Sequence, residues 1–247
     1  MKRVKLIVAY DGTNYHGWQI QPNGITIESE LNRCLKDLLG EDIKVIGASR
    51  TDAGVHALCN VAIFDTQARM PGEKISYALN QRLPEDIRIQ RSEEVPLDWH
   101  PRYRHSVKTY QYHIYCAEFP LPTVRLYSHF TYYHLNTEWM QEACQYFMGE
   151  HDFKSFCSAR SSAETTVRTI TGIHVEKQGD MITIEVSGTG FLYNMVRIIA
   201  GTLMEVGNGV YPPAHVKEII EACDRQQAGP VAPARGLLLY SYDFLEE

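Results

Sequence analysis

The sequence lacks the features of a membrane or secreted protein. It contains no run of about 18 consecutive apolar residues, which is the length that a transmembrane helix needs. The start, MKRVKLIVAY, has a basic head, but its apolar run stops at Asp11, too soon for a secretion signal and its cleavage site. We therefore expect a cytoplasmic protein that has no membrane partner.

The sequence also lacks the spacings of common metal, redox and catalytic motifs. Its six cysteines are scattered, none of them forms a C-x-x-C pair, and its ten histidines are not spaced as metal ligands. It has no G-x-S-x-G, no H-E-x-x-H and no glycine-rich phosphate loop. We expect free thiols and no bound metal.

Acidic residues are absent from two long segments of the chain. The net charge of the whole chain, −6, argues weakly against a nucleic-acid partner. The segments are 99–117 and 186–204, and the first, WHPRYRHSVKTYQYHIYCA, carries Arg102, Arg104 and Lys108 among five aromatic residues. Cations bind phosphates, and aromatic rings stack on unpaired bases. The alternative is a half-buried strand whose tyrosines pack in the core. The distribution predicts a positively charged cleft near Asp52 on an otherwise acidic surface.

The hydrophobic patterns predict a mixed α+β fold. With 247 residues, 44% hydrophobic and 22% charged, the chain is long enough for one large or two small globular domains. The first hundred residues alternate in the order strand, helix, strand, strand, helix, strand, which is the ferredoxin-like or RRM-like pattern with an antiparallel sheet. The expected strands are 4–10, 43–49, 60–66 and 86–95, and the expected helices are 27–39, with Thr26 as N-cap and Gly40 beyond its end, and 74–83.

A second α+β half follows with a less clear pattern. We expect strands at 107–116 and 237–244, and a hairpin over 169–188 that turns at Gln178-Gly179-Asp180. Helices are expected at 137–149, closed by Gly149, and at 191–207 and 214–225. The side chains expected to face inward from the first of these helices are Trp139, Met140, Ala143, Cys144, Phe147 and Met148. The two domains are then 1–104 and 105–247.

The stretch GASRTDAGVHA, residues 47–57, places a carboxylate in a turn beside an arginine. A lone aspartate in a D-A-G turn is far more often structural than catalytic. Arg50, however, lies two residues before Asp52, and a nearby cation favours the ionised carboxylate. An ionised and positioned aspartate can act as a nucleophile or a base without a metal.

The segment GTGFLYNMVRIIAG, residues 188–201, contains a single charge, that of Arg197. A buried cation is costly unless a partner neutralises it, so a carboxylate or a phosphate is one expected partner. The alternative is that the side chain reaches solvent at the helix end. The segment by itself leaves both alternatives open.

Taken together, these blocks resemble the tRNA pseudouridine synthase A family. The stretches SRTDAGVHA and GFLYNMVR are the most specific, and the blocks span almost the whole chain in the family's order. The residues that carry the resemblance are YDGTNYHGWQIQP (10–22), SRTDAGVHA (49–57), KTYQYHI (108–114), the stretch from Val167-Arg168 to Ile173, GFLYNMVRIIAGTL (190–203) and APARGLLL (232–239).

The resemblance implies an isomerase that converts uridine to pseudouridine at positions 38, 39 and 40 in the anticodon stem-loop of transfer RNA. It implies Asp52 as the nucleophile, Tyr110 in the uracil pocket, Arg197 as the partner of the catalytic carboxylate and Arg50 as a base-flipping residue. It also implies a homodimer that needs no cofactor or metal. The domain 1–104 would carry the aspartate motif, and 105–247 would complete the active site around a central RNA-binding cleft.

The chemistry of the reaction agrees with these roles but leaves the route open. Uracil must leave C1′, rotate and rejoin through C5, so the nucleotide must first be flipped out of its stack, at a cost of a few kcal/mol. Attack of Asp52 at C1′, its addition at C6 and its removal of the C2′ proton all require an ionised carboxylate. The sequence does not distinguish among the three routes.

Three other functions compete with this interpretation. An RNA-binding module without chemistry would share the basic and aromatic segment but would not need Asp52. A hydrolase built from Ser49, His56 and Asp52 is disfavoured because the three lie too close in sequence for a usual triad and lack an oxyanion-hole motif. A purely structural oligomer would leave the acid-free, tyrosine-rich stretch without a role.

Overall fold

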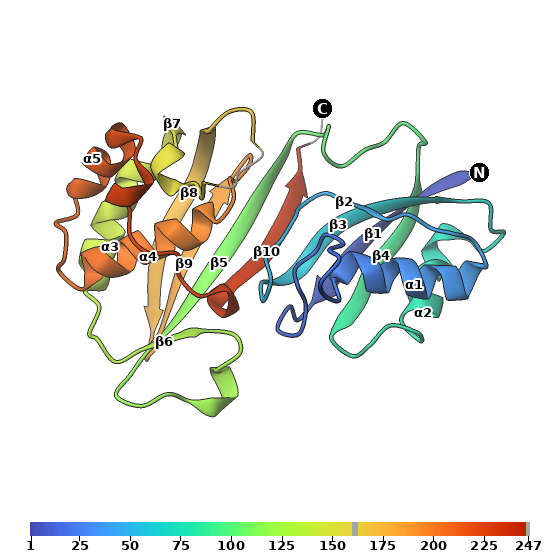
Figure 1. Ribbon diagram of the computed structural model, residues 1–247, viewed down its shortest axis with the longest axis horizontal. Coiled ribbons are helices and arrows are strands. Elements are labelled where there is room, and N and C mark those ends of the chain that lie inside the picture. The colour runs from blue at the N-terminus through green and yellow to red at the C-terminus, as the bar shows by residue number, and fades with distance from the viewer. Residues whose placement is uncertain (160–162, 246–247) are drawn as a thin grey trace. The chain divides into compact units, whose positions relative to one another are not determined.

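The contacts of the chain group it into two units. The computed structural model of the protein describes residues 1–159 and 163–245, which contain ten strands and five α-helices (Figure 1). The first unit is Met1–Ser106 together with the chain from Leu239 onward, and the second is Val107–Leu238. The mixed helix and strand composition is confirmed. That the units are two ferredoxin-like domains around an RNA-binding cleft stays a prediction.

The sheet of the first unit follows from alternating burial along its central strand. Val4, Leu6, Val8 and Tyr10 are buried on one face, and the residues between them are only partly covered. Antiparallel partners flank this strand on both sides in the order β4-β1-β3, and the short β2 pairs with β3 outside this order. The strands are β1 (Lys2–Tyr10), β2 (Ile46–Gly47), β3 (His56–Thr66) and β4 (Ile87–Val95).

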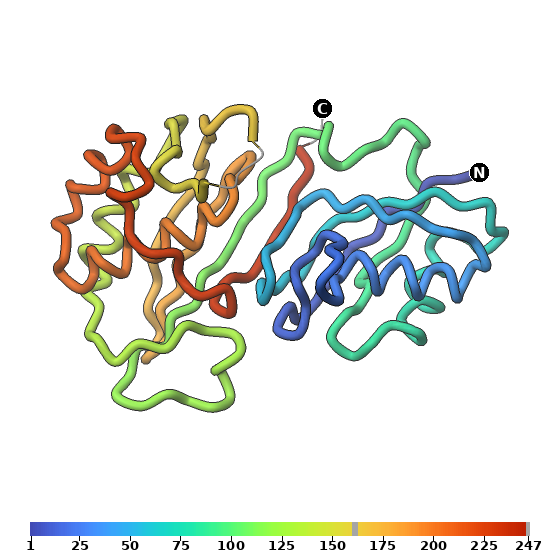
Figure 2. Tube along the Cα trace, in the orientation of Figure 1, coloured from blue at the N-terminus to red at the C-terminus, as the bar shows by residue number. Residues whose placement is uncertain are grey.

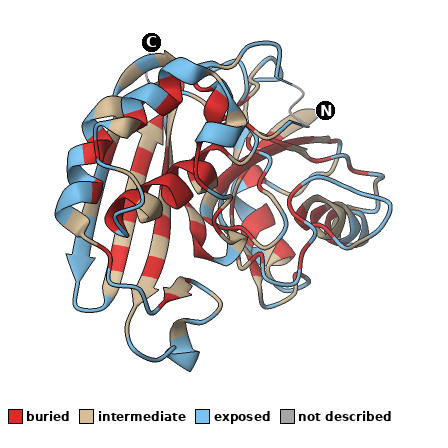
Figure 3. Cartoon of the chain, turned by 60° about the vertical axis from the view of Figure 1, so that its left-hand side comes forward, coloured by how far each residue is buried: buried red, intermediate tan, exposed pale blue. Residues whose placement is uncertain are grey.

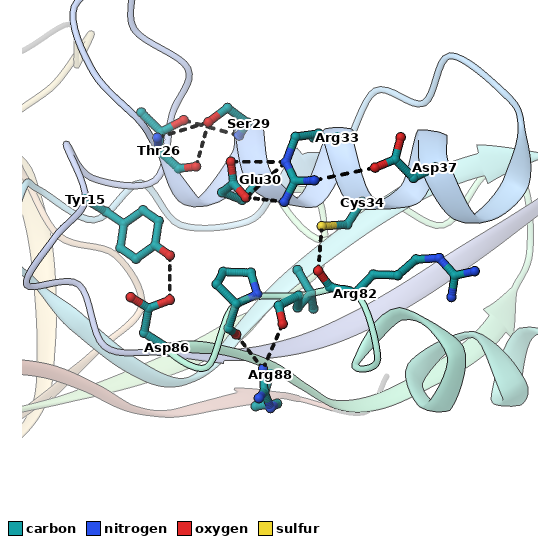
Figure 4. Close-up of polar contacts among 12 residues, drawn as sticks. Tyr15, Thr26, Ser29, Glu30, Arg33, Cys34, Asp37, Arg82, Asp86 and Arg88 are labelled. Atoms are coloured by element: carbon teal, nitrogen blue, oxygen red, sulfur yellow. Dashed lines mark hydrogen bonds and ion pairs between the residues drawn. The ribbon is translucent and has the colours of Figure 1, made fainter.

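Helices α1 (Ile27–Leu39) and α2 (Gly72–Leu79) cover one face of this sheet (Figure 1). The ends of α1 confirm the prediction: the Thr26 hydroxyl accepts from the Ser29 backbone N–H, and Gly40 adopts φ 70° beyond the last turn. The exposed side carries an ion-pair series in which Arg33 contacts Glu30 and Asp37 (Figure 4). The helix is therefore fixed at both ends and along its solvent side.

The second unit is a sheet backed by three helices. Its strands run antiparallel in the order β5-β9-β8-β7, and a short strand, β6, pairs parallel with β5 after the chain loops out and returns (Figure 2). Helix α4 is buried along most of its length (Figure 3). The elements are β5 (Ser106–Cys116), β6 (His129–Thr131), α3 (Thr137–Cys144), β7 (Gly149–Asp152), β8 (Val167–Gln178), β9 (Met181–Gly188), α4 (Met195–Gly207) and α5 (His215–Ala222).

Several expected boundaries are wrong. The strand expected at 43–49 is only the two-residue β2, and at Ser49 the Asn60 side chain of β3 takes the place of a backbone partner. The helix expected at 137–149 ends at Cys144, continues as a 3-10 turn, and Gly149 opens β7 instead of closing the helix. Trp139 and Met148, expected inward, are each 43% exposed.

Three further helices are shorter than expected. The helix α2 spans Gly72–Leu79 and not 74–83, and α4 begins at Met195 and not at 191. The helix α5 stops at Ala222, because Cys223 adopts a left-handed backbone with φ 49°. The hairpin between β8 and β9 turns at Gly179-Asp180, as expected.

The chain's last strand, β10 (Leu237–Phe244), brings residues from far along the sequence into the first unit. The Phe244 ring packs edge-on against Trp99, with centroids 5.3 Å apart, and the Lys5 ammonium lies over the Trp99 ring. The Cys59 thiol donates to the Tyr240 carbonyl at 3.3 Å. No helix in residues 1–159 or 163–245 is long and apolar enough to cross a membrane.

Candidate active site

Asp52 lies on a tight turn between β2 and β3. The Val55 backbone N–H donates to the Asp52 carbonyl at 3.1 Å, and Gly54 has φ 78°, a conformation that glycine adopts without strain. Before the turn, buried and outward positions alternate. Ser49 and Thr51 are buried, whereas Arg50 is exposed and Asp52 is partly exposed. The loop thus places the arginine and the carboxylate on its outer side.

The backbone of this turn is held by the segment 10–18, which lies beneath it. The backbone N–H of Trp18 donates to the Thr51 carbonyl at 3.0 Å, and the backbone N–H of Gly54 donates to the Tyr15 carbonyl at 3.3 Å. The Tyr15 hydroxyl is itself fixed, since it donates to Asp86 at 2.5 Å (Figure 4). Asp52 therefore sits between two backbone anchors.

Two glycines let this segment approach so closely. A Cβ atom on Gly12 would lie 2.0 Å from the Val55 carbonyl oxygen, and one on Gly17 would lie 2.6 Å from the Thr51 carbonyl oxygen. Gly17 also has φ 87°. The block YDGTNYHGW is thus the support of the aspartate turn, and its glycines are required by contact distance.

A buried polar cluster holds the inner side of the loop. The Tyr10 and Thr51 hydroxyls are 2.7 Å apart, and the Asn60 amide donates to the Tyr10 hydroxyl at 3.3 Å. The same amide donates to the Ser49 carbonyl at 3.0 Å, and its oxygen accepts from the Ser49 N–H at 3.4 Å. Burial raises the pKa of Tyr10, so its hydroxyl stays neutral and serves only as a hydrogen-bonding group.

His56 joins the end of the turn to the same segment. Its Nδ1 lies 3.1 Å from the Gly12 N–H, which donates to it, and 3.1 Å from Asp11 Oδ1. The Ser49 hydroxyl, by contrast, is buried and has no hydrogen-bond partner among residues 1–159 and 163–245. A serine nucleophile needs a base within hydrogen-bond reach, so the arrangement does not support a hydrolase built on Ser49, His56 and Asp52.

Tyr110 lies in the second unit, on β5. It is 8% exposed, pairs with Val186 of β9, and meets the Phe191 ring edge-on with centroids 5.2 Å apart. Its neighbour Tyr112 is fully buried and donates to the Pro233 carbonyl at 2.9 Å. Tyr112 therefore packs in the core, as the alternative interpretation of this tyrosine-rich stretch predicts.

Arg197 lies in the first turn of α4, and its guanidinium is held in a fixed orientation. Its Nε donates to the Ala232 carbonyl at 2.7 Å, and its Nη1 donates to the Asn194 side-chain oxygen at 2.9 Å. Asn194 has a left-handed backbone with φ 63°, and its amide nitrogen donates to Ser158 at 2.9 Å. Two donor groups of the guanidinium, Nε and Nη1, thus have hydrogen-bond acceptors within the second unit.

Close backbone contact places Ala232 beside Arg197. A Cβ atom on Gly201 would lie 1.9 Å from the Pro230 carbonyl oxygen, and the Gly229 N–H donates to the Thr202 hydroxyl at 3.0 Å. The segment that leads to Ala232 therefore lies directly against α4. Glycine at position 201 is what makes this arrangement of the arginine's support possible.

The structure brings the expected site residues together in pairs. Arg50 and Asp52 share one loop of the first unit, while Tyr110 and Arg197 are joined in the second unit through the segment that carries Phe191 and Asn194. Sequence reasoning left out Tyr10, Thr51 and Asn194 as site residues. The only signal for Asn194 in the sequence is its residue type, because asparagine adopts the left-handed region more readily than most residues.

No group of three or more His, Cys, Asp or Glu side chains is arranged as a metal site within the part of the chain that the structure describes.

Comparison with known protein families gives a match over most of the chain. The family described as tRNA pseudouridine synthase matches residues 6–104 and 143–244. The chain belongs to the tRNA pseudouridine synthase family. The family consists of isomerases, so the chain is an enzyme of this class.

Curated relatives in the tRNA pseudouridine synthase family match at full length. The tRNA pseudouridine synthase A of Acetivibrio thermocellus is 51% identical over 239 residues, which are 97% of this chain and 98% of that protein. The tRNA pseudouridine synthase A 2 of Clostridium perfringens is 47% identical over the same shares. A solved Cbf5-Nop10-Gar1 complex matches 84% of this chain and 55% of that chain, with a TM-score of 0.33 and 15% identity, which is too little to support an argument.

Proposed function

We propose that this protein converts uridine to pseudouridine in transfer RNA. The observation that carries the proposal is the Asp52 carboxylate, partly exposed on a turn whose backbone is anchored at Thr51 and Gly54, in a chain of the tRNA pseudouridine synthase family. An aspartate on a mobile loop would have to be ordered in every turnover, whereas an anchored one is already in place. The finer proposal is that the targets are positions 38, 39 and 40 of the anticodon stem-loop.

In this proposal the four site residues divide the work. Asp52 acts as the nucleophile or base on the flipped nucleotide, and Arg50, which is exposed on the same loop, occupies the vacated stack or holds a phosphate. Tyr110 contacts the uracil, and its hydroxyl assists in removing the C5 proton. Arg197 supplies the positive charge that keeps the carboxylate ionised. The contacts of its guanidinium with Ala232 and Asn194 support that role, because they hold the charged group in one orientation within the second unit.

We propose further that the enzyme is a cytoplasmic homodimer, that it needs no cofactor or metal, and that 1–104 and 105–247 act as its two domains. Attack at C1′, addition at C6 and removal of the C2′ proton are all compatible with one ionised carboxylate.

The reaction is tested by tritium release from transfer RNA transcripts that carry 5-tritiated uridine, because the new bond at C5 expels the hydrogen there. Wild type should release tritium, and Asp52→Asn should lower the rate by more than about a thousandfold while it still binds the RNA. The matched control is Asp42→Asn, which removes an exposed carboxylate of the same unit that pairs with Lys36 and should not change the rate.

Each outcome has a clear meaning. No release by wild type would overturn the proposed reaction and leave an RNA-binding protein. Release by wild type and Asp52→Asn alike would overturn the role of Asp52. Transcripts with uridine at only one of the three anticodon-arm positions test the finer proposal, which is wrong if none of them releases tritium.

A further inference from the structure

We propose that the hydrogen bond between the hydroxyls of Tyr10 and Thr51 sets the position of the Asp52 carboxylate, so that Tyr10 and Thr51 are positioning residues of the reaction. Neither residue touches the substrate in this account. The inference rests on the proposed function, because it assigns these residues a part in that same chemistry.

The first step of the argument is the location of Thr51. It directly precedes Asp52 and is only 8% exposed, whereas Asp52 is partly exposed. Its carbonyl accepts from Trp18 and its hydroxyl meets Tyr10 at 2.7 Å. Two bonds from different directions fix this residue, and any rotation of it would swing the adjacent carboxylate.

The second step is the rigidity of the group that holds Thr51. Tyr10 is 5% exposed at the end of β1, so its ring is packed within the sheet and against Trp18 at 5.9 Å. Its hydroxyl also accepts from Asn60, which lies on β3. Because β1 and β3 belong to the same sheet, the hydrogen bonds from Asn60 to Tyr10 and from Tyr10 to Thr51 connect the backbone next to Asp52 to that sheet.

The third step compares the expected effect of this hydrogen bond on stability with its expected effect on the rate. A buried neutral hydrogen bond contributes only modestly to folding. A misplacement of about 1 Å in a reacting group, in contrast, can lower a rate by about a hundredfold. A structural role predicts a loss of stability alone, and a positioning role predicts a loss of rate that is out of proportion to it.

The experiment compares two threonines of the first unit. Thr66 is 2% exposed at the far end of β3, and its hydroxyl donates to Glu41 at 2.9 Å, so Thr66→Val makes the same chemical change away from the turn. For each variant we would measure the thermal midpoint, the Kd for transfer RNA and the single-turnover rate of tritium release at saturating RNA. Thr51→Ser keeps the hydroxyl and serves as the conservative variant.

We expect Thr51→Val to lower the single-turnover rate by about ten- to a hundredfold with its Kd within about twofold of wild type. Thr51→Ser should restore most of the rate, and Thr66→Val should lose stability without losing rate. Tyr10→Phe removes the same bond from the other side, together with the bond from Asn60. It should therefore slow the reaction at least as much, and adding it to Thr51→Val should cause little further loss of rate. Tyr10→Phe also keeps the test valid if Thr51→Val does not fold.

Three outcomes would overturn the inference. One is a Thr51→Val rate within about twofold of Thr66→Val, another is a loss found only in Kd, and the third is full additivity of Tyr10→Phe and Thr51→Val. If wild type itself releases no tritium, the proposed function is overturned and this inference with it. An active wild type with matched threonine variants overturns the inference alone.

Discussion

The two units hold their proposed site residues in different ways. In the first unit, the anchors lie on the backbone around Asp52: Thr51 and Gly54 are bonded to the segment beneath, and glycines allow that segment to come close. In the second unit, the arginine itself is held, because the guanidinium of Arg197 donates to Ala232 and Asn194. Side-chain length accounts for the difference. The position of a short aspartate carboxylate is set largely by its backbone, whereas a long arginine side chain needs contacts at its guanidinium.

Among tests of this difference, the largest effect should come from replacing the guanidinium of Arg197. Arg197→Lys keeps the charge but cannot make both donations in the same geometry, so we expect the single-turnover rate to fall about a hundredfold with little change in stability. The control is Arg225→Lys, because Arg225 of the same unit is also partly buried and donates to a carbonyl, that of Ala228. Equal rates for the two variants would contradict this account of the second unit.

The next effect should come from the glycines of the first unit. Gly17→Ala introduces a Cβ atom 2.6 Å from the Thr51 carbonyl at a positive φ, so it should lower the free energy of unfolding by about 2–4 kcal/mol and slow the reaction about thirtyfold. Gly40→Ala is the matched variant, since Gly40 also has a positive φ, but nothing lies within 4 Å of its Cβ position. It should cost only about 1 kcal/mol and leave the rate unchanged. Urea unfolding and tritium release measure both quantities.

A smaller effect is expected for Asn194→Gly, which keeps the left-handed backbone but removes the amide. We expect a rate about tenfold lower, and the lost bond to a charged group should lower the free energy of unfolding by about 1.5–3 kcal/mol. Asn136→Gly makes the same change at the start of α3, where the asparagine oxygen caps the Trp139 N–H. That variant should leave the single-turnover rate unaltered. If Asn136→Gly is also slow, a loss of stability of the second unit explains the lower rates of both variants, and the contact of Asn194 with Arg197 does not.

The smallest effect should be seen away from both sites, in the pair of Arg3 with Asp65 at 2.7 Å. The hydrogen bond and charge of Arg3 lower the pKa of Asp65. The folded state then binds the proton more weakly than the unfolded state, so the stabilisation is complete above the ordinary aspartate pKa of about 4 and is lost as the pH falls through the lower folded value. Asp65→Asn should flatten this acid limb of stability, measured by urea unfolding, and leave the rate near neutral pH unchanged.

Local patterns predicted the elements better than their ends. Thr26 and Gly40 fixed α1 correctly because capping depends on residues within one turn. The end of α3 was wrong because Gly149 belongs to a strand whose partner, β8, lies almost twenty residues further along the chain. A boundary that depends on a distant strand has no local signal.

The candidate site shows the same limit. Asp52, Arg50, Tyr110 and Arg197 were identified from motifs, and their roles stay predictions. The support of the turn could not be read from RTDAGV, because it comes from a block about forty residues earlier and depends on distances between backbones. Tyr10 and Thr51 look ordinary in sequence, and only the 2.7 Å contact between their hydroxyls distinguishes them.

Asn60 extends the pairing of β2 by one step with a side chain. The last backbone bond there runs from Ala48 to the Val61 carbonyl at 2.7 Å, and the next pair of groups, on Ser49, is met by the Asn60 amide. A carboxamide presents an N–H donor beside a carbonyl acceptor, as a peptide group does, and its second N–H is left to donate to Tyr10. Asparagine is therefore the residue that suits this position. Aspartate has the same shape but no donor, and glutamine has the same carboxamide on a side chain that is one methylene too long.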